Sequence, residues 1–121
     1  MGDGPGRDTA VPAGDRGHLH IADRAVERIV LAAAGQVPGA VRVTGALARS
    51  YPRADVVVAG NRVRAAVAVA GRWPVSATRL ATEVRSTVAE QLRRLAGMRV
   101  DAVDVTVASM VRDDRRQRRV Q

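Results

Sequence analysis

Hydrophobic residues recur at the helical period in two stretches of the chain, about residues 23–34 and about residues 76–96. The first stretch has the stripe Val26, Ile29, Val30 and Ala33. The second has the longer stripe Ala77, Leu80, Ala81, Val84, Val88, Leu92 and Leu95. Gly35 suits the left-handed end of the first helix, and Ser76 and Gly97 suit the N-cap and the end of the second. The pattern therefore predicts one short and one long amphipathic helix.

Five other segments alternate apolar and polar residues, which is the period of a half-buried strand. They are residues 18–21, 41–47, 54–59, 62–70 and 99–111. Gly60-Asn61 separates the third segment from the fourth and predicts a two-residue hairpin turn. Gly45 inside the second segment indicates a bulge or a close approach, and we expect an exposed loop at residues 49–53.

These elements predict an α+β fold with the order β-α-β-β-β-α-β. One-sided helices and strands favour a two-layer sandwich, with a mixed sheet and both helices on one face. The opposite face of the sheet should then carry polar side chains. We expect on it His18, His20, Arg42, Thr44, Arg62, Arg64, Asp104 and Thr106.

Composition limits both the core and the chemistry. There is no Phe, one Trp and one Tyr, so the core must consist of Val, Ala, Leu and Ile. The absence of Cys excludes disulfides and thiol nucleophiles. No charge-free apolar run approaches the ~18 residues of a membrane span, and the N-terminus lacks the pattern of a signal peptide.

The ends of the chain differ from its middle. Residues 1–16 are rich in Gly, Pro, Asp and Ala without an apolar period, so we expect an unstructured segment. Residues 17–111 hold all the predicted elements and form one domain. Residues 112–121 form an arginine-rich tail with five Arg and two Asp.

Candidate catalytic and metal-binding residues are few. His18 and His20 would share one face of a strand, but two histidines do not complete a zinc site. They remain either solvent-facing residues or, if Asp104 lies on a neighbouring strand, part of a metal site. No serine lies in a G-x-S-x-G motif, and no phosphate-binding loop is present. We therefore expect no enzyme, no catalytic residue, no metal and no cofactor.

The net charge of +8 is the strongest feature of the composition. The tail concentrates part of it and would contact an anionic membrane surface, nucleic acid or a partner, or simply keep the end of the chain solvated. Its arginines are Arg112, Arg115, Arg116, Arg118 and Arg119.

Three stretches of this sequence resemble the alkaline shock protein family, also called the envelope stress response family. They are residues 17–22 (Gly-His-Leu-His-Ile-Ala), residues 37–41 (Val-Pro-Gly-Ala-Val) leading to Gly45, and residues 73–107 from Trp-Pro-Val to Val-Asp-Val-Thr-Val. The matching positions are Gly17, Ile21, Ala22, Val37, Gly39, Val41, Gly45 and Gly97. Asp23-Arg24 departs from the family, which usually has Pro-Glu there.

This resemblance implies a non-enzymatic protein of envelope stress response and cell-envelope homeostasis. It implies a bacterial, cytoplasmic homo-oligomer that docks as a scaffold on a membrane-anchored partner at the inner face of the cell membrane. The alternative is a module that binds the backbone of nucleic acid through Arg42, Arg62 and Arg64, which the pI of about 11.6 favours. No predicted strand carries an aromatic residue on which bases would stack, which opposes this alternative.

Overall fold

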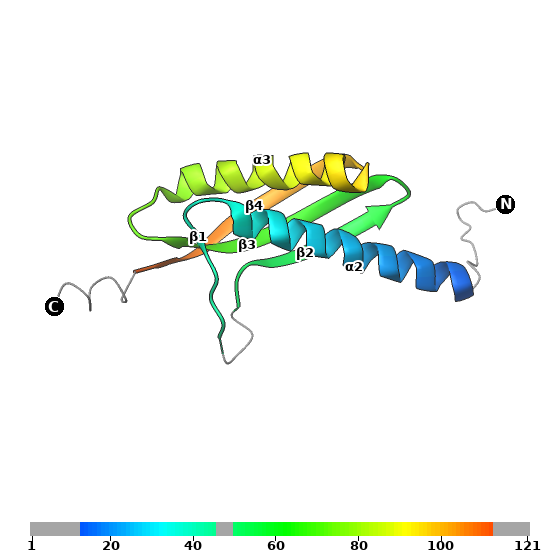
Figure 1. The fold of residues 1–121 in the computed structure, drawn as a ribbon, viewed down its shortest axis with the longest axis horizontal. Helices are drawn as coiled ribbons and strands as arrows, with labels where there is room; N and C mark the ends of the chain where they lie inside the picture. Colours follow the sequence, from blue (N-terminus) through cyan, green and yellow to red (C-terminus); the bar gives the residue numbers. More distant parts are fainter. Residues whose placement is uncertain (1–12, 46–49, 113–121) are drawn as a thin grey trace.

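In the described part of the chain, two helices lie on one face of a four-stranded sheet (Figure 1). The computed structural model describes residues 13–45 and 50–112. Its elements are α2 (Ala13–Gln36), β1 (Ala40–Val41), β2 (Arg53–Ala59), β3 (Arg62–Arg72), α3 (Ala77–Ala96) and β4 (Arg99–Val111). The predicted α+β class with two layers is confirmed, and from α2 onward the order of elements follows the prediction.

Strand β3 is the centre of the sheet. It pairs antiparallel with β2 and with the short β1, and parallel with β4 on its other side. The sheet is therefore mixed, as predicted. The hairpin between β2 and β3 turns at Gly60 and Asn61, where Gly60 has φ 61°. A glycine meets no Cβ penalty at this positive φ.

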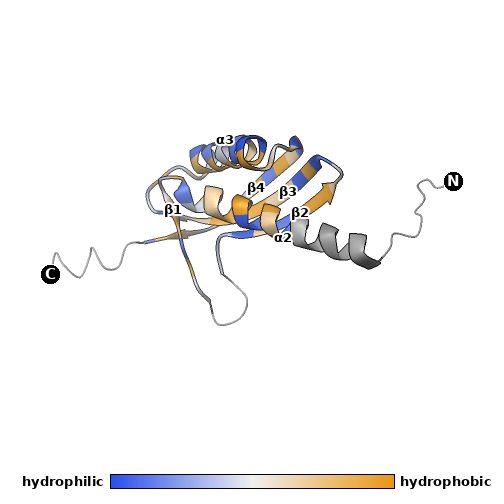
Figure 2. Ribbon diagram, turned by 45° about the vertical axis from the view of Figure 1, so that its right-hand side comes forward, coloured by the Kyte–Doolittle hydropathy of each residue, from blue (hydrophilic) through white to orange (hydrophobic). Residues whose placement is uncertain are grey.

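The core lies between the sheet and the helices and consists of Val, Ala and Leu side chains, as the composition predicts. Figure 2 shows hydrophobic and hydrophilic residues alternating along the strands. Because every second strand residue faces the helices, one row of each strand is buried. The buried residues of this core are Val26, Val30, Ala33, Ala34, Val37, Val63, Ala65, Val67, Val69, Leu80, Val84, Val88, Leu92 and Val103.

Helix α3 begins and ends as predicted. The side chain of Ser76 accepts a hydrogen bond from the backbone N–H of Arg79 at 3.3 Å, which caps the first turn. Gly97 has φ 64°, and its N–H donates to the carbonyl of Leu92. The two ends of the predicted stripe are wrong, because Ala77 is exposed and Leu95 is 65% exposed, and neither belongs to the core.

The N-terminal part of the prediction needs correction. Residues 18–21, expected as a strand, lie inside α2, which starts at Ala13 and so also takes in the last residues of the expected unstructured segment 1–16. A run of four residues is too short to distinguish the helical period from the strand period. The helical pattern that continues toward Val26 determines the structure of this run. Gly35 is not the left-handed end of the helix, because α2 continues to Gln36 and the positive φ falls at Gly39.

The chain between β1 and β2 leaves the sheet, so the predicted strand 41–47 is much shorter than expected. Residues 42–45 and 50–52 run side by side away from the body of the domain (Figure 1), and we call them the arm. The N–H groups of Val43 and Tyr51 donate to each other's carbonyls at 3.1 and 2.8 Å. Tyr51 is buried, so the expectation of an exposed loop at 49–53 is wrong at this residue.

Candidate functional site

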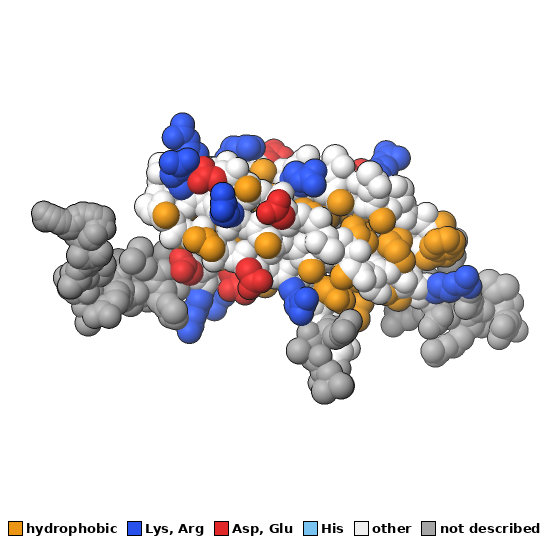
Figure 3. Space-filling model, turned by 180° about the vertical axis from the view of Figure 1, so that it is seen from behind, with side chains coloured by type: hydrophobic (Ala, Val, Ile, Leu, Met, Phe, Trp, Pro, Cys, Tyr) orange, Lys and Arg blue, Asp and Glu red, His pale blue; other side chains and the backbone are white. Residues whose placement is uncertain are grey.

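The face of the sheet opposite the helices is open and of mixed charge. Figure 3 shows acidic, basic and small hydrophobic side chains interspersed on one half of this side of the molecule, whereas hydrophobic side chains gather on the other half. Arg62, Arg64, Asp104 and Thr106 are exposed there as predicted. Arg62 forms an ion pair with Asp101 at 3.0 Å, which takes up one of the cations expected to attract a polyanion.

The other four residues expected on this face lie elsewhere. His18 and His20 lie in α2. Arg42 and Thr44 lie on the arm, because β1 ends at Val41. The predicted basic surface of Arg42, Arg62 and Arg64 is therefore divided between two parts of the molecule.

The arginine-rich tail falls almost wholly outside the described residues. Arg112 follows β4 and is exposed, whereas Arg115, Arg116, Arg118 and Arg119 lie beyond them. Their role stays a prediction.

The positions that carry the family resemblance are distributed over several elements. Gly17, Ile21 and Ala22 lie in α2, Val37 and Gly39 form the turn after it, and Val41, Gly45 and Gly97 follow in β1, the arm and the end of α3. At Gly39, with φ 97°, an added Cβ would come within 3.2 Å of Val75. This turn therefore holds the end of α2 close to the start of α3.

A recess lies between α2 and the arm. It has a volume of about 380 Å³, and we call it the arm groove. Its lining residues are Arg28, Leu31, Ala32, Arg42, Val43, Thr44, Ser50, Tyr51 and Pro52. A smaller recess of about 70 Å³ beside Gly35 and Val69 shares Arg42 and Pro52 with it, so the groove extends toward the C-terminal end of α2.

Local structure explains how the groove is built. Arg28, Leu31 and Ala32 are spaced i, i+3 and i+4 along α2, so they share one face of the helix. The opposite wall is held in place by the arm's backbone hydrogen bonds and by Gly45, whose N–H donates to Ser50 Oγ at 3.3 Å. At the base of the arm, the Arg53 guanidinium lies 5.4 Å from the centre of the Tyr51 ring, which orders this residue further.

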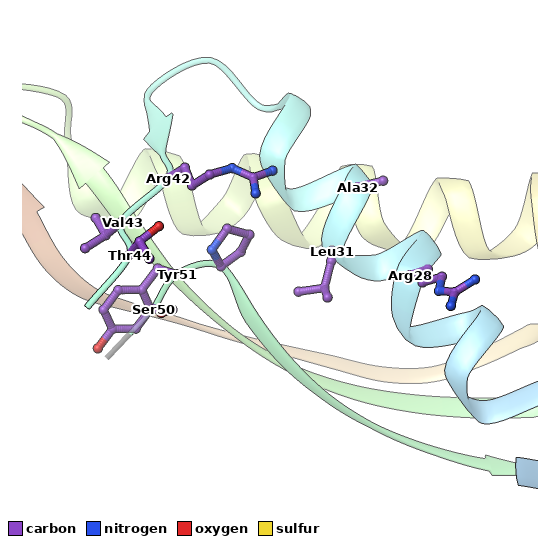
Figure 4. Close-up of a pocket in the computed structure, with 9 residues that line it drawn as sticks. Arg28, Leu31, Ala32, Arg42, Val43, Thr44, Ser50 and Tyr51 are labelled. Carbon is purple, nitrogen blue, oxygen red and sulfur yellow. The ribbon is translucent and has the colours of Figure 1, made fainter. Parts of the chain in front are cut away.

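Both charges of the groove are positive. Figure 4 shows the Arg42 side chain extending from the arm toward α2, while Arg28 lies farther along the helix and Leu31 points toward the arm. Arg28 and Arg42 are exposed, and neither forms an ion pair with another described residue. No acidic side chain of the described residues lines the groove. The groove thus combines an apolar floor, made by Leu31, Ala32, Val43 and Pro52, with two arginines that have no ion-pair partner among the described residues.

The charged and apolar side chains of the groove could contact a ligand or a protein partner. Among its described lining residues there is no carboxylate and no histidine. Within the described residues, no three His, Cys, Asp or Glu side chains are grouped so that they could hold a metal ion. No helix in the described ranges is long and apolar enough to cross a membrane.

Sequence reasoning did not single out Arg28 as a site residue. The available signal was Leu31 with Ala32, two apolar residues that lie off the core-facing stripe of α2. Leu31 is half-buried and Ala32 exposed, as expected of a second apolar face without a partner element.

Solved structures share this fold. A triple variant of the MamM C-terminal domain (MamM CTD) is 19% identical, with a TM-score of 0.54, covering 71% of this chain and 93% of that one. A zinc form and a nickel form of MamM CTD variants are each 18% identical with a TM-score of 0.54. Each aligns with 71% of this chain and with 84% and 96% of its own length, respectively. At this identity the likeness concerns the fold alone.

Family membership rests on the sequence. No curated protein matches the chain. The profile of the Asp23 family, described as having a cell envelope-related function, matches residues 12–112, and here Asp23 names the family and not the residue at position 23. This range includes every helix and strand that the structure describes, since α2 begins at Ala13 and β4 ends at Val111. The chain belongs to the Asp23 family, the alkaline shock protein family that its sequence resembles.

Proposed function

We propose that this protein is a non-enzymatic scaffold of cell-envelope homeostasis and the envelope stress response. In this role it self-associates and docks on a membrane-anchored partner at the inner face of the cell membrane. The observation that carries the proposal is the match of the envelope-related family over residues 12–112. The character of the arm groove supports it, because an apolar floor suits a protein contact when it lies beside two arginines without ion-pair partners among the described residues.

Cell fractionation tests the docking. The full-length protein, expressed at its native level, should sediment with membranes and should crosslink to a membrane protein in intact cells. High-salt washing should release it more readily than it releases an integral membrane protein. Recovery of the protein wholly in the soluble fraction, without a crosslinked membrane protein, would overturn the docking proposal.

Sedimentation velocity of the purified full-length chain tests self-association. The sedimentation coefficient should rise with protein concentration through the micromolar range. A single monomeric species at every concentration would contradict self-association and leave the docking proposal to the fractionation experiment.

The tail contributes to this proposal as an accessory. Each basic residue close to an anionic leaflet adds about 1 kcal/mol of attraction, so the tail arginines would strengthen a peripheral contact. A variant with Arg115, Arg116, Arg118 and Arg119 changed to Gln should float less with phosphatidylglycerol vesicles at low salt. Equal flotation of the variant and the unmodified protein would show that the tail has no such role.

A further inference from the structure

We propose that the arm groove binds an acidic segment of a protein partner, in which an aliphatic side chain lies between two carboxylates. The inference rests on the proposed docking function and names the surface and the chemistry of the contact. It comes from the charge, the apolar floor and the arrangement of Arg28, Leu31 and Arg42.

The positive charge of the groove favours a negatively charged partner. The domain pairs several of its exposed arginines internally, namely Arg62 with Asp101, Arg79 with Glu83 and Arg94 with Glu90. Arg28 and Arg42 share one recess and have no such partner among the described residues. A guanidinium presents a planar fork of donors that matches a carboxylate in two parallel hydrogen bonds. A ligand with two carboxylates would therefore form an ion pair with each of the two guanidinium groups.

The apolar floor excludes a small inorganic anion as the sole occupant. Leu31, Val43 and Pro52 are half-buried and Ala32 is exposed, so a ligand without hydrocarbon would leave this surface wet. A recess of about 380 Å³ has room for a branched side chain. Aliphatic side chains on the ligand would cover the floor and exclude water from the ion pairs, which strengthens them.

The arrangement of the side chains sets the order of groups on the ligand. In Figure 4, Arg42 and Arg28 lie at opposite ends of the groove with Leu31 between them; Leu31 points toward the arm, and the Arg28 side chain extends away from Arg42. A ligand that contacts all three must therefore present acid, apolar group and acid in that order. A peptide segment with Glu or Asp on both sides of Leu, Ile or Val meets this requirement.

Fluorescence anisotropy with the full-length protein tests the proposal. The probe is a labelled peptide with three Glu-Leu-Glu units joined by Gly-Ser, and the control peptide has Gln in place of every Glu. The Glu peptide should bind and the Gln peptide should not. Arg28→Glu and Arg42→Glu should each raise the Kd about tenfold or more, because each removes a charge-assisted pair.

Matched variants separate the groove from general basic attraction. Arg64→Glu makes the same charge change on the open face of the sheet, where Arg64 is exposed, and should leave the Kd within about twofold. Ala32→Trp should block the groove without changing its charge, whereas Ser86→Trp on the exposed side of α3 should have no effect. Circular dichroism confirms that each variant is folded. A peptide with Lys in place of Glu should bind Arg42→Glu better than it binds the unmodified protein.

Two results would overturn the inference. One is an equal loss of peptide binding in Arg64→Glu and Arg28→Glu with no effect of Ala32→Trp, which would indicate diffuse electrostatics. The other is binding of phosphatidylglycerol vesicles, but not of the peptide, in a manner that depends on Arg28 and Arg42. That result would assign the groove to lipid.

Fractionation of the same variants keeps this inference distinct from the proposed function. If the unmodified protein sediments with membranes and the double variant Arg28→Glu/Arg42→Glu does so equally, the scaffold stands and the groove is not its docking site. If the unmodified protein is wholly soluble but binds the Glu peptide through the groove, the membrane docking fails and the groove still recognises acidic segments.

Discussion

Gly71 of β3 lies directly beneath Leu80 of α3, with no room for a side chain between them. A Cβ built on Gly71 would come within 2.8 Å of Leu80 Cδ2 and within 2.8 Å of Met110 Sδ. Leu80 is fully buried in the first turn of α3. The glycine therefore sets how closely the start of α3 approaches the sheet.

Gly71→Ala should destabilise the domain by about 1–3 kcal/mol, because an added methyl group overpacks this contact. The free energy of unfolding from urea denaturation measures it. Leu80→Val shortens the opposing side chain, so the double variant should lose less than the two single variants together. A stability of Gly71→Ala equal to that of the unmodified protein would mean that the contact relaxes at no cost.

Two leucines in the last turns of α3 should differ sharply in their contribution to the free energy of unfolding. Leu92 is fully buried, whereas Leu95 is 65% exposed although it continues the hydrophobic stripe. Leu92→Ala should cost about 2–5 kcal/mol by leaving a cavity, and Leu95→Ala should stay within about 0.5 kcal/mol. Thermal or urea unfolding of both variants checks this, and a large loss in Leu95→Ala would place that side chain in an interface.

Local signals account for the parts of the fold that could be predicted. At α3 the apolar stripe, the cap residue Ser76 and the terminating Gly97 all agree. The Gly60-Asn61 turn lies between two alternating runs that pair in register. Where the hydrophobic period, the cap residues and the turn residues all indicate the same element, a single sequence is enough to predict that element.

The candidate site could not be predicted because it depends on where the chain leaves the sheet. Alternation from Val41 to Leu47 continues past the end of β1, and only pairing with β3 shows that the strand stops after two residues. Arg42 therefore changes from a predicted position on the sheet to a wall of the arm groove. Its neighbour across the groove, Arg28, is distant in sequence, and no local pattern brings the two together.

The hydroxyl of Ser76 should stabilise α3 as its N-cap. Its Oγ accepts from the N–H of Arg79 at 3.3 Å, so Ser76→Ala should cost about 1 kcal/mol. Ser86→Ala is the matched control, because Ser86 lies exposed inside the same helix, where Ala is the better helix former. The control should be neutral or slightly stabilising in urea unfolding. A loss in Ser86→Ala as large as that in Ser76→Ala would contradict the capping role.

Two glycines near helix ends should respond in opposite directions to the same substitution. Gly97 has φ 64°, where a Cβ meets its own backbone, so Gly97→Ala should cost about 1–2 kcal/mol. Gly35 lies within α2, and a Cβ there would meet nothing within 4 Å. Gly35→Ala should therefore raise the free energy of unfolding by about 0.5–1 kcal/mol, since it restricts the unfolded chain. Urea unfolding of the two variants side by side measures both signs, and destabilisation by Gly35→Ala would show that α2 does not continue through this residue in solution.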